Sequence, residues 1–178
     1  MPNRIRTNIE LTLNIVIAIA IVIVLGIAVK RFLFTSPTIV GAPRPELGIG
    51  SPVSVPNVDW QQNKKSLIFF LKKDCAYCNQ SAPFYRSLIE DAAKRGVKLL
   101  AILPDPIEVG TQYVQSLNLS IKTVQTGSLA HYQIPGAPSL VFVDDQGIAR
   151  GVWIGMPPPN LQEKMRRELI ALFDRDSF

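Results

Sequence analysis

Cysteine and histidine are scarce in this chain of 178 residues, which has two cysteines, Cys75 and Cys78, and one histidine, His131. A structural zinc site usually takes four ligands, from two cysteine pairs or from one pair with histidines. The one conceivable site would need both cysteines, His131 and a carboxylate. The sequence therefore argues against a metal centre, and we expect neither a metal nor an organic cofactor.

The residues after position 31 also carry little net charge. Of the formal net charge of +5, the N-terminal group of Arg4, Arg6, Lys30 and Arg31 against Glu10 accounts for +3. The rest of the chain carries fifteen basic and thirteen acidic residues, with no basic stripe interleaved with aromatics. Without that electrostatic footprint, we expect no nucleic-acid partner.

One long hydrophobic run stands out near the N-terminus. The nineteen residues Leu11–Val29, LTLNIVIAIAIVIVLGIAV, contain no charge, and apolar flanks extend the run to residues 9–34. As a helix the uncharged core would be roughly 28 Å long, close to the roughly 30 Å hydrocarbon core of a bilayer. A cleaved signal peptide usually has a shorter apolar region and a small-residue cleavage site, which is not evident here. We predict a single transmembrane anchor over 9–34, preceded by a short segment over 1–8.

The orientation of this anchor does not follow from charge, because basic residues lie on both sides of the span. The short segment before the span suits an uncleaved signal anchor. We therefore expect a single-pass membrane protein whose C-terminal part lies outside the cytoplasm, facing the periplasm if the source is bacterial.

A linker and one domain follow the anchor. Residues 35–48 are rich in proline and glycine, a composition typical of an extended tether. From residue 49 to 178, apolar runs alternate with amphipathic helical patterns, which predicts an α/β fold with a mixed sheet flanked by helices. The predicted strands are 66–71, 97–103, 121–125 and a hairpin over 139–154, and the predicted helices are 82–95, 108–118, 128–133 and 160–173.

The two cysteines are three residues apart, directly after the buried strand predicted over 66–71. A structural disulfide would close a very short loop and would restrain the unfolded chain little. A cysteine at a helix N-terminus is activated instead, because unsatisfied backbone N–H groups stabilise its thiolate. The placement favours a redox pair in which Cys75 is the nucleophile and Cys78 the resolving thiol.

Three sequence features together resemble the thioredoxin-like superfamily: CAYC after a buried strand, Ala82-Pro83 beyond the second cysteine, and IPGAPSLVFVDDQG over 134–147. The resemblance implies a thioredoxin-like fold over roughly 51–173. It also implies a cis proline at Pro138, preceded by Ala137, beside the cysteine pair. Pro83 would kink the helix behind the active site, as an interior proline does.

With the anchor and the extra segment over 104–130, the chain looks most like the membrane-tethered, TlpA-like and AhpC/TSA-related branch. That resemblance implies a thiol–disulfide oxidoreductase that exchanges disulfides with protein partners and is reset by a membrane or soluble redox partner. The bilayer itself would be contacted through the N-terminal helix. Beside the cysteines, the expected active-site residues are Asp74, Ala76, Tyr77, Ala137 and Pro138.

Two departures from the family pattern bear on the chemistry. Asp74 stands where the family often has tryptophan, and it is expected either to act as a solvated helix cap or to repel a thiolate on Cys75. Phe69 stands where many thioredoxins keep a buried acid, and it cannot accept a proton. His131 is a further candidate for a proton shuttle, although the sequence shows no partner for it.

Two other functions stay open. A peroxiredoxin-like peroxide reductase would share the fold, but Cys75 occupies the position of the peroxide-binding threonine and Cys78 that of the peroxidatic cysteine. A tethered binding or chaperone-like module would use the apolar surface around the cysteines without chemistry.

Overall fold

The computed structural model describes residues 46–175. Within this range no helix is both long and apolar enough to cross a bilayer. The predicted anchor over 9–34 lies outside the described residues, as does most of the predicted linker, and both stay predictions.

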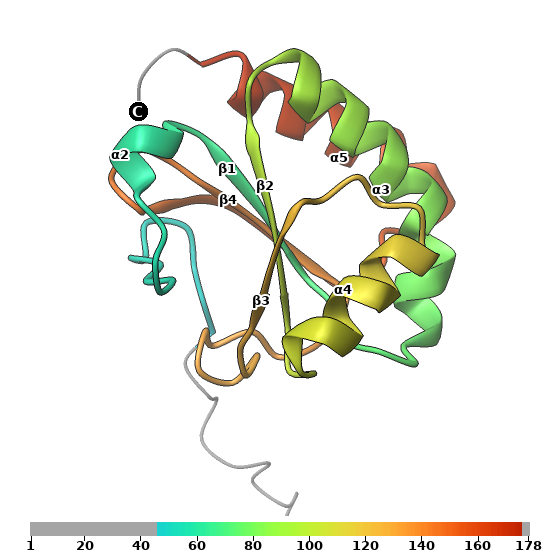
Figure 1. Ribbon diagram of the computed structural model, residues 1–178. Helices are drawn as coiled ribbons and strands as arrows, with labels where there is room; N and C mark the ends of the chain where they lie inside the picture. Colours follow the sequence, from blue (N-terminus) through green and yellow to red (C-terminus); the bar gives the residue numbers. More distant parts are fainter. Residues whose placement is uncertain (1–45, 176–178) are drawn as a thin grey trace, which may run out of the picture. The chain divides into compact units, whose positions relative to one another are not determined.

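The described chain forms a five-stranded mixed sheet with helices packed against it (Figure 1). The strand order is β3-β2-β1-β4-β5, in which β1, β2 and β3 are parallel and β4 is antiparallel to both of its neighbours. This arrangement confirms the predicted α/β class and the mixed sheet. The strands are β1 (Ser66–Phe70), β2 (Lys98–Leu103), β3 (Thr123–Thr126), β4 (Ser139–Val143) and β5 (Ala149–Ile154), and the helices are α2 (Trp60–Asn63), α3 (Ala76–Lys94), α4 (Ile107–Ser116) and α5 (Pro159–Phe173).

The central strand β1 is buried along its whole length, as its uninterrupted apolar sequence predicts. Its side chains alternate between two cores. Leu67 and Phe69 face a core shared with α3, α4 and α5, whereas Ile68 and Phe70 face a second core on the other side of the sheet. The first core therefore lies directly behind the segment that carries the cysteines.

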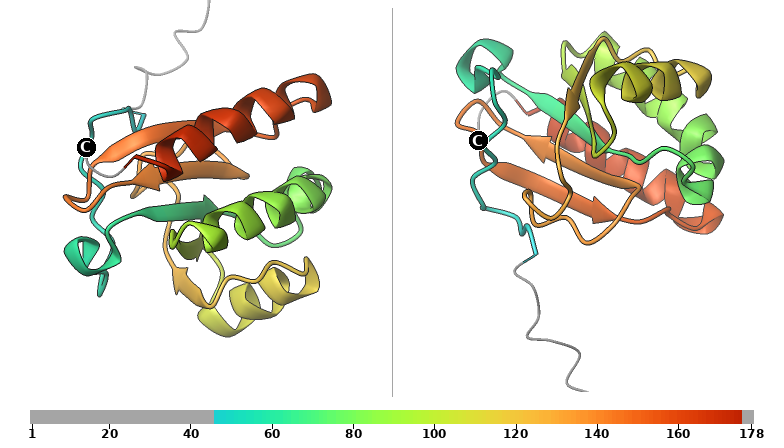
Figure 2. Two further views of the ribbon diagram at one scale, coloured as in Figure 1. Left: turned by 90° about the horizontal axis from the view of Figure 1, so that it is seen from above. Right: turned by 60° about the horizontal axis from the view of Figure 1, so that its bottom comes forward.

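Helices α3, α4 and α5 lie on one face of the sheet, and Figure 2 (left) shows α3 between the other two. Both parallel crossovers, through α3 and α4, pass over this same face. The opposite face is covered by α2, the N-terminal residues from Leu47 onward and the loop before β4. Trp60 is partly buried against the second core and Trp153 against the first.

Two local predictions need correction. Residues 128–133 form consecutive turns rather than a helix, with hydrogen bonds from His131 N–H to Ser128 and from Gln133 N–H to Ala130. Gln133 has a φ of 56° and Pro135 follows closely, so a helix cannot continue there. The short helix α2, capped by the Asp59 carboxylate, was not predicted, because a single turn leaves no hydrophobic period to detect.

Asp144 holds the turn between β4 and β5. Its buried carboxylate accepts the N–H groups of Gln146 and Ile148, at 2.9 and 2.8 Å, and pairs with Arg150. We expect Asp144→Ala to lower the free energy of unfolding by about 3 kcal/mol, since it removes the buried acceptor of two backbone N–H groups together with its ion pair. Urea denaturation would measure this. The exposed neighbour variant Asp145→Ala is the control, and equal stabilities of the two variants would refute the role of Asp144.

Candidate active site

The two cysteines lie at the start of α3, just beyond the carboxyl end of β1. Cys75 is the N-cap of α3, and its Sγ accepts the backbone N–H of Cys78 at 3.2 Å. The two side chains are joined as a disulfide, with their Cα atoms 5.2 Å apart. An N-cap receives the unsatisfied N–H groups of the first helical turn, so the same contact can stabilise negative charge on Cys75 after reduction.

The two sulfurs differ sharply in accessibility. Cys75 is partly exposed, whereas Cys78 has no exposed surface and belongs to the core between the sheet and α3. An external disulfide can therefore reach Cys75 and not Cys78. This asymmetry fits the predicted division into an attacking and a resolving cysteine.

The loop before β4 brings its proline segment next to Cys75. The Ala137-Pro138 peptide bond is cis, which confirms that expectation, and Cys75 Sγ lies 3.6 Å from the Ala137 carbonyl oxygen. Gly155 N–H donates to the Pro138 carbonyl at 2.7 Å, and the Ser139 hydroxyl donates to the Gly136 carbonyl at 2.7 Å. These bonds tie the loop to both β4 and the segment after β5, so the position of Ala137 is well determined.

Asp74 does not cap α3, contrary to one of its predicted roles, because Cys75 occupies the N-cap position. Asp74 is exposed and has a φ of 59°, a left-handed conformation that aspartate tolerates better than most residues. Its negative charge affects the pKa of Tyr113 in α4. Burial raises the pKa of Tyr113, and the carboxylates of Asp74 and Asp105 raise it further.

The sequence did not predict a small polar cluster near the start of α3. The Tyr113 hydroxyl donates to Asn79 Oδ1 at 2.8 Å, and Lys73 N–H donates to the Asp105 carboxylate at 3.1 Å. The first bond joins α3 to α4, and the second joins the loop before α3 to the loop after β2. No sequence signal could have paired them, since the partners lie more than thirty positions apart.

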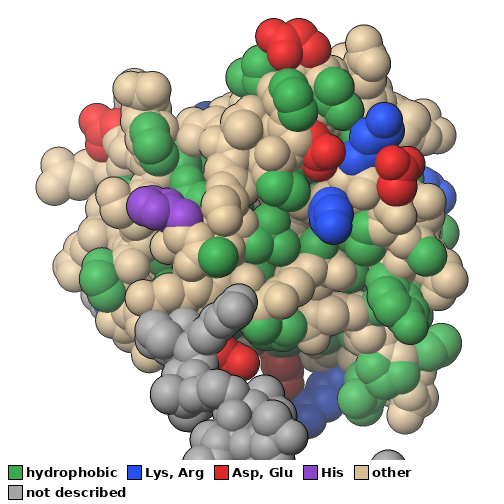
Figure 3. Space-filling view, turned by 90° about the horizontal axis from the view of Figure 1, so that it is seen from below, with side chains coloured by type: hydrophobic (Ala, Val, Ile, Leu, Met, Phe, Trp, Pro, Cys, Tyr) green, Lys and Arg blue, Asp and Glu red, His purple; other side chains and the backbone are tan. Residues whose placement is uncertain are grey.

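Ala76 and Tyr77, the residues between the cysteines, are exposed, and Tyr77 exposes 60% of its surface. Figure 3 views the molecule from the end where β1 and β2 finish, and apolar side chains are spread across that face among a few charged ones. His131 packs edge-on against Tyr132, which belongs to the core on the other face of the sheet from Cys78. In the described range no contact joins His131 to the cysteines.

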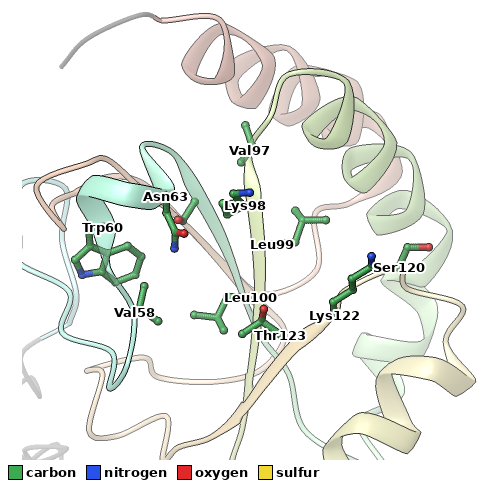
Figure 4. Close-up of a pocket in the computed structure, with 11 residues that line it drawn as sticks. Val58, Trp60, Asn63, Val97, Lys98, Leu99, Leu100, Ser120, Lys122 and Thr123 are labelled. Atoms are coloured by element: carbon green, nitrogen blue, oxygen red, sulfur yellow. The ribbon is translucent and has the colours of Figure 1, made fainter.

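Other potential sites are weaker. Among residues 46–175 no group of three metal-ligating side chains is found. A cavity of about 340 Å³ opens at the opposite end of the sheet, where β1 and β2 begin, between Trp60 and Asn63 on one side and Lys122 on the other (Figure 4). It contains neither cysteine and lies far along the strands from them.

Comparison with known proteins places this site in a family. The model of the AhpC/TSA family matches residues 42–151, which is more than half of the chain. The chain belongs to the AhpC/TSA family. In a comparison with curated proteins, nothing matches. The matched range contains the cysteine pair, the cis proline and four of the five strands in full.

Solved structures share the fold at low sequence identity. A candidate thiol:disulfide interchange protein DsbE from Chlorobium tepidum is 15% identical with a TM-score of 0.60, over 72% of this chain and 99% of that one. A thiol:disulfide interchange protein from Bacteroides sp. is 12% identical with a TM-score of 0.54, over 76% and 94%. A candidate thioredoxin from Neisseria meningitidis is 23% identical with a TM-score of 0.53, over 71% and 91%.

These neighbours confirm the thioredoxin-like fold of the AhpC/TSA family member. Together with the cysteine pair at disulfide distance, the family and the fold support thiol–disulfide oxidoreductase activity.

Proposed function

We propose that this AhpC/TSA family member is a membrane-tethered oxidoreductase that exchanges disulfides with protein partners through Cys75 and Cys78. The observation that carries the proposal is the asymmetry of the pair. Cys75 caps the helix and is accessible beside Ala137, while Cys78 is buried one turn further along.

In the reducing direction, the thiolate of Cys75 attacks one sulfur of a substrate disulfide. A bond forms between Cys75 and that sulfur, and the other substrate sulfur leaves as a thiolate, which takes up a proton. Cys78 then attacks Cys75 Sγ, so that the Cys75–Cys78 disulfide forms and the second substrate thiol is released. The substrate gains two electrons and the enzyme pair loses them. The oxidising direction is the reverse of these steps.

The Ala137 segment is suited to hold the substrate. It lies beside Cys75 and is fixed by the bond from Gly155 to Pro138. An extended substrate segment would pair with this backbone as an added strand does, which presents its sulfur to Cys75. The exposed ring of Tyr77 offers an apolar contact on the same rim.

The sequence is the basis for proposing a membrane anchor and a location outside the cytoplasm. The hydrophobic run over 9–34 would anchor the domain in a bilayer and place it outside the cytoplasm. Disulfides persist in such compartments, so partners with accessible disulfides or thiols would be available there. A second redox protein, in the membrane or soluble, would return the pair to its working state.

Peroxide reduction is the other activity to weigh for an AhpC/TSA family member. Peroxide chemistry needs an accessible thiolate, and Cys78, at the peroxidatic position, has no exposed surface. Cys75 at the threonine position also leaves no hydroxyl there to bind peroxide. Disulfide exchange explains why one cysteine is accessible and the other is buried, whereas peroxide reduction explains neither position.

The reduction potential of the pair tests the proposal and sets the direction of electron flow. The chain would be equilibrated with glutathione or dithiothreitol buffers and the fraction of free thiol measured. A value near or below about −250 mV would identify a reductant of partner disulfides, and a value near about −120 mV an oxidant of folding proteins. If no reversible couple is found, a binding module replaces the oxidoreductase.

A further inference from the structure

Cys78 lies in a core without an obvious group to stabilise its thiolate. Burial in apolar surroundings disfavours a charged sulfur, yet the resolving step needs one. In the described range, the side chains that β1, β2 and β4 turn toward this core are apolar: Leu67 and Phe69, Ala101 and Leu103, and Leu140 and Phe142.

Buried carboxylates elsewhere are already engaged. In the described part of the chain, the buried acids are Asp91 and Asp144. Asp91, far along α3, pairs at 2.7 Å with Arg166, the α5 cation that faces α3. Asp144 serves the turn after β4. Neither is available to Cys78.

The remaining charged and titratable groups lie at the mouth of the site. The loop before α3 contributes Lys72, Lys73 and Asp74, all exposed, and the loop after β2 and α4 contribute Asp105 and Tyr113, both half-buried. The hydroxyl of Tyr113 already donates to Asn79. These groups are exposed or half-buried, whereas Cys78 has no exposed surface.

Two hydroxyls share the buried face of α3 with Cys78. Ser81 and Tyr85 follow it at spacings of three and seven residues, and all three have no exposed surface. Because side chains on a helix tilt toward its N-terminus, these spacings favour approach of the Ser81 hydroxyl to Cys78 and of the Tyr85 hydroxyl to Ser81. The Tyr85 ring also packs edge-on against Phe69, with ring centroids 5.4 Å apart.

Both hydroxyls are poorly satisfied while the cysteines form a disulfide. Within residues 46–175, neither Ser81 Oγ nor Tyr85 Oη makes a hydrogen bond of ordinary geometry. They still influence each other. Burial raises the pKa of Tyr85 far above its usual value, and a weak hydrogen bond with the Ser81 hydroxyl lowers it in part. The phenol therefore stays protonated and can serve as a donor.

We propose that Ser81 is a positioning residue whose hydroxyl donates a hydrogen bond to the Cys78 thiolate, with Tyr85 supporting Ser81 from the next turn. This inference rests on the proposed disulfide exchange. A disulfide sulfur is a weak acceptor and a thiolate a strong one, so the Ser81 hydroxyl, whose contact with Tyr85 is weak in the oxidised protein, can gain a strong acceptor when Cys78 is ionised.

The hydroxyl acts in one step. When a mixed disulfide joins Cys75 to a substrate sulfur, Cys78 gives its proton to water, and Ser81 stabilises the resulting thiolate. The thiolate attacks Cys75 Sγ, the Cys75–Cys78 bond forms and the bond to the substrate breaks. The substrate leaves as a thiolate and takes up one proton, so protons and electrons balance. Ser81 keeps its own proton throughout.

The test measures the reactions of Cys75 and Cys78 one after the other. The reduced full chain is mixed with one equivalent of 5,5′-dithiobis(2-nitrobenzoate) across a pH series. Attack by Cys75 releases the first coloured thiolate, and attack by Cys78 on the mixed disulfide releases the second. For Ser81→Ala we expect the second release to be about tenfold slower at neutral pH, with its pH midpoint raised and the first release unchanged. Tyr85→Phe should change the second release in the same direction.

Matched variants complete the design. Ser66→Ala removes another buried, unpartnered hydroxyl, but on the first residue of β1 at the far end of the sheet, and it should leave both releases unchanged. Ser81→Thr keeps the hydroxyl and should keep the wild-type pH midpoint. A wild-type second release in Ser81→Ala would overturn the role of Ser81. Absence of any release from the wild-type chain would instead overturn the proposed exchange.

Discussion

Replacing Cys75 with serine is expected to abolish disulfide exchange. Serine keeps the N-cap geometry of α3, because its hydroxyl can still accept the Cys78 N–H, so the helix should remain intact. It removes the accessible sulfur that forms the mixed disulfide, and the buried Cys78 cannot reach an external disulfide. Reduction of a protein disulfide by dithiothreitol, with and without the variant, would show no acceleration above the reaction without enzyme.

The comparison that isolates the chemistry is between the two single-cysteine variants. With one equivalent of a chromogenic disulfide, Cys78→Ser should still release one thiolate rapidly through Cys75, and Cys75→Ser should not. Circular dichroism and urea denaturation would establish that both variants are folded. Rapid reaction of Cys75→Ser would mean that Cys78 is accessible, and the assignment of the two roles would be wrong.

Replacing Cys78 with serine is expected to trap partners covalently. Cys75 still attacks a substrate disulfide, but no second thiol lies within reach to displace the mixed disulfide. Cys78 lies one turn inside α3 and is fully buried. Serine differs from cysteine by a single atom, oxygen in place of sulfur, so the substitution changes the packing of the core little. Adducts that disappear on reduction should accumulate on a non-reducing gel of cells that express the variant.

The Cys75→Ser/Cys78→Ser double variant is the control for this trapping, since adducts through the pair require Cys75. Fractionation of the adducts would also test the proposed location. Partners outside the cytoplasm would agree with a tether over 9–34, and cytoplasmic partners would contradict it. If the single variant forms no adduct beyond the double variant, the two-step exchange with protein partners is refuted.

Several parts of the fold could be predicted because they depend on local pattern. The continuous apolar run over 66–71 indicated a strand buried on both faces, and the structure has β1, over 66–70, at the centre of the sheet. The amphipathic spacing over 160–173 likewise predicted α5, which starts one residue earlier at Pro159. Such elements are set by hydrophobic period, which the sequence carries directly.

The errors fall where tertiary contacts decide conformation. Residues 128–133 have a composition that a helix tolerates, but the turns there bring Tyr132 and Ile134 into the core opposite α3. Asp74 is a good cap by propensity, yet the chain places Cys75 at the cap and leaves Asp74 one residue outside the helix. Propensity cannot distinguish two neighbouring cap positions when packing of the helix against the sheet selects one of them.

The sequence by itself determined the redox pair, its position after a buried strand and the proline segment that the family resemblance linked to it. Spacing and residue type suffice for these, because they are properties of neighbouring positions. The tertiary structure alone decided that Cys75 is accessible beside Ala137, that Cys78 is buried among apolar strands, and that the poorly satisfied hydroxyls of Ser81 and Tyr85 are buried in the same core. Burial and hydrogen bonding depend on which distant segments pack together, and that information exists only once the chain has folded.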